Sequence, residues 1–335
     1  MHDSGKSGWN SVILLMVFVL LLQGNAAGAG KSPGDQGEKG KAGASVASSV
    51  NDFAVDLFGA LAEKKGNLFL SPFSISTALD MTLAGARGKT AAQMKKVLHA
   101  EKNGDDLHAA VGNLVKDLNA AGKKNVKLSV ANALWVQKNF SIESAFSALL
   151  DKHYKAGLRE VDFAGSSEAA RKTINAWVED ETQKKIKDLL KPGVIDGGTR
   201  LVLTNAIYFK GTWKRTFKKE DTQDAPFTVA PGKTVETKMM HRKGDFRMGW
   251  TDTMQVLELP YAGGDLSMIV LLPSEADGLA ALEKALTTEK IDAAVAGLQE
   301  REVDVFLPKF TMTSEFVLND PLVALGMKDA FSAGS

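Results

Sequence analysis

Few residues of this sequence have the types and spacing that enzyme chemistry requires. The run from Gly85 to Thr90, GARGKT, ends like a phosphate-binding loop. The motif GxxxxGK[ST] needs a glycine at position 83, however, where this chain has Leu83. There is no HExxH pair, and the five histidines, which we expect at the surface or in loops, never cluster at metal-ligand spacing: His2, His99, His108, His153 and His241. We therefore expect no enzyme activity, no nucleotide site, no metal and no cofactor.

One polar residue needs partners that its own segment does not supply. Asn205 lies in the run Leu201 to Phe209, which reads as a strand whose two faces are both largely apolar. Such a strand is expected in the centre of a sheet that is covered on both sides. A buried amide without a hydrogen-bond partner costs about 1–3 kcal/mol, so the rest of the chain should bring polar groups to Asn205.

The first candidates for these partners are two hydroxyls at the start of a helix. Ser71-Pro72 has the N-cap serine and first-turn proline that open helices, and Ser74 follows in the first turn. The alternative is that Ser71 and Ser74 only cap this helix. The spacing of apolar residues leaves both interpretations open.

The secondary-structure elements that must position these residues are mainly helices in the first part of the chain and mainly strands in the second. Helical periodicity dominates as far as the stretch from Ser167 to Leu190, interrupted by a strand over Val126 to Val136 that also contains an asparagine, Asn132. Strand patterns then predominate, including a hairpin from Gln255 to Leu272. Helices first and strands later predict an α+β fold.

The composition indicates an ordinary globular protein whose charges produce no strong overall electrostatic field. The 335 residues are 44% hydrophobic and 24% charged, and 41 basic against 40 acidic side chains give a net charge of +1. Nothing in this balance favours nucleic acid or an anionic membrane as a partner. Exposed lysine pairs such as Lys95-Lys96 could bind a polyanion, but neighbouring acids favour solvated helix faces. With no cysteine, disulfides, thiol catalysis and zinc–cysteine sites are excluded.

The N-terminus predicts export. Lys6 precedes the apolar run from Val12 to Leu22, and Ala27-Gly28-Ala29 fits a cleavage site, so residues 1–29 are expected to be a secretory signal peptide. The alternative is an uncleaved anchor, for which the apolar run is short. Residues 30–46 are Gly- and Lys-rich and are expected to be a flexible linker. We expect a secreted or, in a bacterium, periplasmic protein with no membrane contact after cleavage, and a folded domain over residues 47–335.

Five blocks of the sequence, in this order and at this spacing, resemble the serpins from about Val50 to the last residue. They are NLFLSPFSISTALDMTLAGARGKT, ARKTINAWVEDETQKKIKDLL, LVLTNAIYFKGTWKRTF, LELPYAGGDLSMIVLLP and VDVFLPKFTMTSEFVLNDPLVALGMKDAF. The resemblance implies a large mixed main sheet, two smaller sheets and eight to nine helices. It also implies that Ser71, Ser74 and Asn205 form the "shutter", where two central strands of the main sheet part, and that Trp213 belongs to the "breach" at its top.

The function that the resemblance implies is suicide inhibition of a serine, sometimes a cysteine, protease. The protease cleaves an exposed reactive loop, which then inserts into the main sheet as a new strand. Non-inhibitory serpins that act as carriers, chaperones or storage proteins are the alternative, and an enzyme on this fold is a third hypothesis that no residue favours.

This sequence departs from the serpin pattern at its C-terminus. The reactive loop, the closing strands and the histidine that usually completes the shutter have no counterpart before Ser335, so no scissile residue can be named. We expect an incomplete serpin domain that is inactive and association-prone through unpaired strand edges. The full-length parent is expected to be an active monomer.

Overall fold

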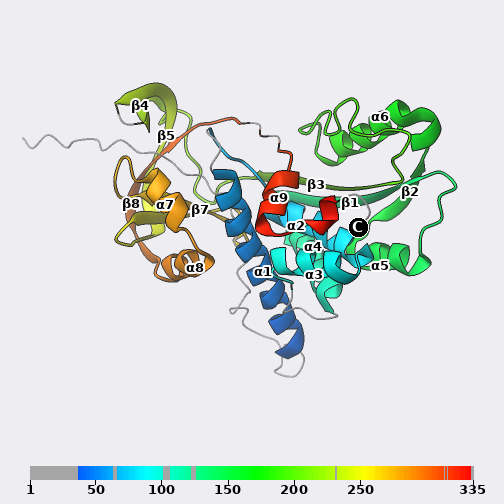
Figure 1. The fold of residues 1–335 in the computed structure, drawn as a ribbon. Coiled ribbons are helices and arrows are strands. Elements are labelled where there is room, and N and C mark those ends of the chain that lie inside the picture. The colour runs from blue at the N-terminus through cyan, green and yellow to red at the C-terminus, as the bar shows by residue number, and fades with distance from the viewer. Residues whose placement is uncertain are drawn as a thin grey trace, which may run out of the picture. The chain divides into compact units, whose positions relative to one another are not determined.

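The computed structural model describes residues 37–62, 66–100, 106–121, 126–230, 232–312, 314 and 316–332. The chain separates into two compact units, one built mainly from residues 71–211 and one mainly from residues 212–315, and each is described by itself. Helices dominate the first unit and strands the second (Figure 1). The predicted α+β class is confirmed. The expected signal peptide, residues 1–29, lies outside the described residues.

The first unit contains a three-stranded sheet in the order β2–β1–β3. Strand β1 (Val126–Gln137) runs parallel to β2 (Gly157–Val161) and antiparallel to β3 (Leu201–Gly211). The predicted strand around Asn205 is therefore present, but the expectation that it is central is wrong for the described residues, where β3 pairs with β1 alone. Both of its faces are nevertheless covered, as its apolar pattern predicted.

Helices cover the two faces of this sheet (Figure 1). On one face lies α6 (Phe163–Glu181), whose apolar side packs with Trp135, Ala133 and Val202 of the strands. On the other face lies a layer formed by α2 (Pro72–Gly85), α3 (Gly88–Val97), α4 (Leu107–Ala121) and α5 (Ser144–Tyr154). The alternation of side chains along β3 thus sends residues 202, 204, 206 and 208 toward α6 and residues 203, 205 and 207 toward the layer of α2 to α5.

The helix α6 ends earlier than periodicity predicts, at Glu181 instead of Leu190. A short turn begins at Phe163, where the Asp162 side chain accepts a hydrogen bond from the Gly165 N–H, and a kink at Ser166 separates it from the long helix, which starts at the predicted Ser167. Gln183, Lys184 and Asp188 have positive φ angles of 52°, 62° and 50°. A right-handed helix cannot pass through such residues, so the apolar residues beyond Thr182 pack from an irregular segment.

The expected linker is corrected by helix α1 (Gly37–Ala62), which takes up most of residues 30–46. Val46, Ala47 and Val50 are between 1% and 6% exposed and extend the apolar face of Phe53 and Leu57 toward the N-terminus. Burial of this face outweighs the helix penalty of the glycines. The same unit ends with α9 (Asn319–Leu325) and a short 3₁₀ turn, η2 (Asp329–Phe331).

The second unit is built on a five-stranded sheet. Its strands β4 (Gln223–Ala230), β5 (Lys233–Trp250), β6 (Met254–Pro260) and β7 (Ser267–Pro273) follow one another in space, and β8 (Gln299–Pro308) pairs with β5. The described residues thus form one sheet here, held together by the 18 residues of β5, which pair with β4, β6 and β8 along their length. Two helices accompany the sheet, α7 (Leu279–Ala285) and α8 (Thr288–Ala296).

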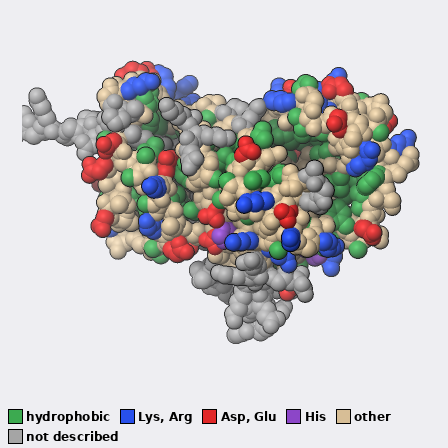
Figure 2. Space-filling view, in the orientation of Figure 1, with side chains coloured by type: hydrophobic (Ala, Val, Ile, Leu, Met, Phe, Trp, Pro, Cys, Tyr) green, Lys and Arg blue, Asp and Glu red, His purple; other side chains and the backbone are tan. Residues whose placement is uncertain are grey.

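The visible face carries basic and acidic side chains interspersed with one another (Figure 2). This mixture agrees with the net charge of +1. Within the described part of the chain, no helix combines the length and the apolar character that a membrane span requires.

Candidate functional site

A pair of asparagines forms the polar centre of the three-stranded sheet. Asn132 of β1 and Asn205 of β3 are direct cross-strand partners. The Asn205 Nδ2 donates to the Asn132 Oδ1 at 2.8 Å, and the Asn132 Nδ2 donates to the backbone carbonyl of Tyr154 at 3.0 Å. A short chain of hydrogen bonds therefore connects the end of α5 to the strand β3.

The hydrogen bonds of Asn205 are nevertheless incomplete. Its Oδ1 is buried and has no partner among the described residues. A buried acceptor without a donor costs about 1–3 kcal/mol, so this position of β3 favours any arrangement that supplies an N–H or O–H group.

The two serines lie where the sequence predicts but bond to each other. Ser71 is the N-cap of α2, and its Oγ accepts from the Ser74 N–H at 3.3 Å and donates to the Ser74 Oγ at 3.0 Å. Helix α2 packs against β3. Of the two interpretations that the sequence left open, this structure favours the capping role, because the hydroxyl of Ser71 bonds to Ser74, and the Asn205 Nδ2 donates to Asn132 instead.

The edge of β3 that faces away from β1 is the most unusual feature of this region. All eleven residues of β3 face β1 on one side, and no described strand pairs with the other side. Only one of these residues, Lys210, is charged. Unpaired strand edges are normally blunted by charges, prolines or bulges, so this edge is chemically suited to pair with a further strand.

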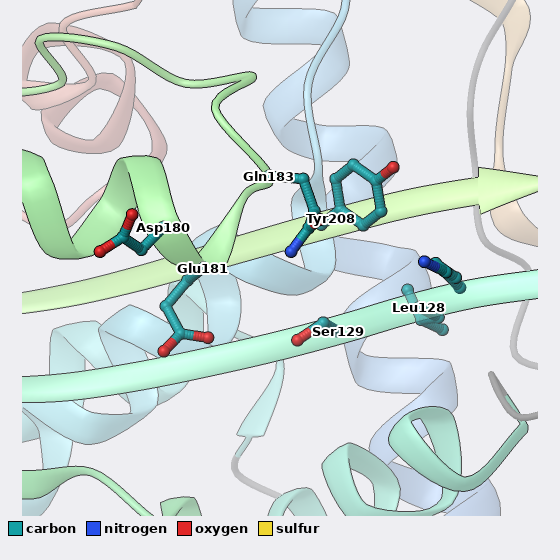
Figure 3. A pocket seen from close by; sticks show the side chains of 7 residues that line it. Leu128, Ser129, Asp180, Glu181, Gln183 and Tyr208 are labelled. Carbon is teal, nitrogen blue, oxygen red and sulfur yellow. The ribbon is translucent and has the colours of Figure 1, made fainter.

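A polar hollow of about 280 Å³ opens on the α6 side of the same strands (Figure 3). Its floor includes Ser129 and Tyr208, which are cross-strand partners, and the end of α6 contributes Asp180 and Glu181. Polar and charged walls do not seal the helix against the sheet as a packed apolar contact would. At this end of β3, α6 covers the sheet without being closely packed on it.

Buried titratable groups lie behind the asparagine pair. Asp80 of α2 is 4% exposed, and its Oδ1 has no hydrogen-bond partner among the described residues. Burial raises the pKa of Asp80 to about 8. The nearby hydroxyl of Tyr154 lies 2.7 Å from the His108 Nδ1. Burial, with smaller effects of His153 and Lys95, lowers the pKa of His108 to about 4.

The outcome for His108 corrects the expectation that the histidines are surface or loop residues. It lies in a helix, α4, and its ring packs edge-on against Tyr154, with the centroids 5.8 Å apart. His99 forms an ion-pair contact with Asp56 at 2.7 Å, and His241 lies in β5. Among the described residues, no group of three His, Cys, Asp or Glu side chains could hold a metal ion.

Trp213, the predicted breach residue, is described within the second unit. Its ring stacks on Tyr261 with centroids 4.4 Å apart and planes at 11°, and the two residues form an isolated bridge. The Ala262 N–H donates to the Thr212 carbonyl at 2.7 Å and fixes the segment. Trp213 thus anchors the chain immediately after β3 ends.

Sequence reasoning missed two members of the site. In the sequence, Asn132 is a second asparagine within an apolar strand. That Asn132 and Asn205 share this feature is the signal that could have predicted their pairing. Asp80 was not singled out, although a carboxylate between Leu79 and Met81 on an apolar helix is the same kind of signal.

The comparisons with known proteins identify the class to which this fold and site belong. The family model Serpin (serine protease inhibitor) matches residues 48–335. The chain therefore belongs to the serpin family, as the five sequence blocks indicated, and its relatives imply serine proteases as the targets of this family.

Individual relatives give the extent of the likeness. The chain is 45% identical over 291 residues to "Leukocyte elastase inhibitor" of Sus scrofa, which covers 84% of this chain and 76% of the relative. The structure of ovalbumin from emu (Dromaius novaehollandiae) superposes with a TM-score of 0.83 at 34% identity, over 86% of this chain and 79% of ovalbumin. A loop-inserted, cleaved ovalbumin mutant superposes with a TM-score of 0.80 at 32% identity, over 86% of this chain and 80% of the ovalbumin chain.

Proposed function

We propose that the protein is an exported inhibitor of serine proteases that acts by inserting a cleaved reactive loop as a new strand beside β3. The almost uncharged edge of β3 that faces away from β1, with which no described strand pairs, is the observation that carries this proposal. The family supports the target class, and the loop-inserted ovalbumin structure is an example of such an insertion in a relative.

The chemistry of the site fits this mechanism. An entering strand brings backbone N–H and C=O groups to the β3 edge, and main-chain hydrogen bonds supply the binding energy of strand addition. A hydroxyl or amide side chain on the matching face of the entering strand would supply the donor that the buried Asn205 Oδ1 lacks among the described residues. The loosely sealed end of α6 leaves room for the helix to shift as the strand enters.

Ser71, Ser74 and Asn205 are the residues that we propose as the shutter, with Asn132 as a fourth member. Asn132 holds the side chain of Asn205 through its Oδ1 and is itself held by the Tyr154 carbonyl. We propose that inhibition requires a form of the protein that carries a reactive loop.

Incubation of a loop-carrying form with serine proteases tests the inhibitor proposal. Elastase-, trypsin- and chymotrypsin-like enzymes should be compared, because the relative from Sus scrofa is named an elastase inhibitor. We expect a covalent complex with one of them that survives SDS. Cleavage of the loop by all three without such a complex would contradict inhibition and favour the non-inhibitory alternative.

A peptide-binding experiment tests the β3 edge in the chain as it stands. An extended peptide of alternating small and apolar residues should protect backbone amides of β3 from hydrogen exchange and leave those of β8 unchanged. The control is the same peptide with proline at alternate positions, which cannot donate the ladder hydrogen bonds. Equal protection by both peptides, or none by either, would count against strand addition at β3.

A further inference from the structure

The turn that follows β1 carries a motif that the inhibitor function does not use. Asn139-Phe140-Ser141 is the single Asn-x-Ser/Thr triplet of the whole sequence. In proteins that pass through a eukaryotic secretory pathway, such a triplet, with any middle residue except proline, is the acceptor for an N-linked glycan.

The backbone holds Asn139 at the tip of a tight turn. The Phe140 N–H donates to the Gln137 carbonyl at 2.9 Å and closes the turn, and the Lys138 N–H donates to the Val161 carbonyl at 2.8 Å and ties it to the end of β2. Asn139 has a φ of 62°, a left-handed conformation that asparagine adopts more readily than other non-glycine residues. The turn is therefore fixed to the ends of β1 and β2.

The side chains of the triplet are accessible. Asn139, Phe140 and Ser141 are all exposed, and Phe140 keeps 45% of its surface in solvent. No hydrogen bond within the described part of the chain engages the amide of Asn139 or the hydroxyl of Ser141. The buried Asn132, by contrast, uses both ends of its amide.

The segment after the triplet gives a modifying enzyme room to bind. Residues 140–143 have no regular secondary structure before α5 begins at Ser144. Binding of this segment by a modifying enzyme therefore breaks no helix or ladder hydrogen bond.

We propose that Asn139 is an N-glycosylation site, a proposal that rests on the export proposed above. The Asn139 Nδ2 forms a bond to C1 of a sugar, and the bond from C1 to the pyrophosphate of a lipid-linked oligosaccharide breaks. The lipid pyrophosphate leaves, and the amide nitrogen gives up one proton. The glycan then stands at the end of β1 and shields the exposed ring of Phe140.

The position of the glycan is compatible with strand insertion. Asn139 lies seven residues along the chain from Asn132, which at the rise of a strand corresponds to on the order of 20 Å. The polar hollow at Ser129 lies farther along the same strand. We therefore expect the glycan to leave the asparagine pair unchanged.

Expression of the whole chain in eukaryotic secretory cells tests the site. The expected result is a wild-type protein whose mass falls by one glycan after treatment with an N-glycan-releasing amidase. N139Q and S141A should both lack this shift, and the matched variant S141T should keep it. Secreted wild-type protein without a glycan, or a shift that persists in N139Q, would overturn the proposal.

A second form separates this result from the export proposal. Residues 1–29 are replaced by an unrelated cleavable secretion signal, so that the chain enters the pathway whatever its own N-terminus does. A glycan on this form but not on the natural chain would mean that the triplet is a competent acceptor and that export, and with it modification of the natural protein, is wrong. Absence of a glycan from the secreted form with the unrelated signal would overturn the site itself.

Discussion

Two edge strands of the molecule, β3 in the three-stranded sheet and β8 in the five-stranded sheet, differ in their content of charged residues. β3 has a single charged residue in eleven, Lys210. β8, which pairs only with β5 among the described strands, has four in ten and ends at Pro308. Its charges are matched by partners on neighbouring segments, as in the pairs Lys243–Glu302 at 2.9 Å and Arg215–Glu300 at 3.7 Å.

This difference separates an edge that is protected from one that is available. Exposed charges and proline discourage the addition of a further strand, whereas an almost uncharged edge without such features favours it. The polar groups of the β3 region are instead buried beneath the strands, at Asn132, Asn205 and Asp80. The stability of that region should therefore depend on burial and pH, and that of the β8 region on ionic strength.

Removal of a buried tryptophan should give the largest difference between the two regions. Trp135 is 2% exposed, donates from its Nε1 to the Thr204 Oγ1 at 2.9 Å and packs edge-on against Trp177. We expect Trp135→Ala to lower the free energy of unfolding by about 3–5 kcal/mol. Trp250→Ala is the matched change in the second unit, where the ring is 54% exposed under Arg301, and should cost about 1 kcal/mol or less. Equal losses in urea unfolding would contradict the comparison.

Disruption of the asparagine pair should have the next largest effect. Asn132→Ala leaves the Asn205 amide and the Tyr154 carbonyl without their partner, and we expect a loss of about 2–3 kcal/mol. Ser129→Ala, on the same strand but toward the polar hollow, should change the stability by about 0.5 kcal/mol or less. Hydrogen exchange should locate the loosening at β3. An unchanged exchange rate there in Asn132→Ala would mean that the pair does not support the strand.

The buried carboxyl group predicts a pH dependence of unfolding. The pKa of Asp80 is raised from 3.8 to about 8, so between these values the folded state binds the proton and the unfolded state does not, and stability falls as pH rises. The pKa of His108 is lowered from 6.5 to about 4, so between these values its contribution to stability rises with pH. The contributions of Asp80 and His108 therefore offset each other between about pH 4 and 6.5.

Stability should therefore fall mainly between about pH 6.5 and 8, by roughly 2 kcal/mol at about 1.4 kcal/mol per pH unit. Asp80→Asn should abolish this fall and leave a rise from about pH 4 to 6.5 that is due to His108. Asp277→Asn, which removes an exposed carboxylate, is the control and should retain the fall. Thermal melts across this range give the measurement, and parallel curves for wild type and Asp80→Asn would refute the assignment.

The smallest effect should come from the ion pairs of the protected edge. Hydrogen bonding to Glu302 raises the pKa of Lys243, but both side chains are more than half exposed. Lys243→Ala should therefore change the melting temperature only slightly, and raising the salt concentration should reduce the difference further because exposed pairs are screened. A large loss that persists in high salt would show that this edge also depends on buried interactions.

Much of the fold followed from local patterns. The capping serine Ser71 with Pro72, the strands around Asn132 and Asn205, and the order of helices before strands were all predicted correctly, because capping and apolar alternation act within a few residues. The end of α6 and the start of α1 were not. Those boundaries depend on residues 183–190 packing without a helix and on the burial of Val46 and Val50, which are tertiary effects.

By itself, the amino-acid sequence determined the family, the α+β class and the presence of an amide that had to find a partner. Only the tertiary structure decided that this partner is Asn132, that one edge of β3 has no described neighbour and that Asp80 lies buried without a hydrogen bond to its Oδ1. The physical reason is that segment patterns record which groups must be buried, whereas strand register and helix packing decide which of those groups meet.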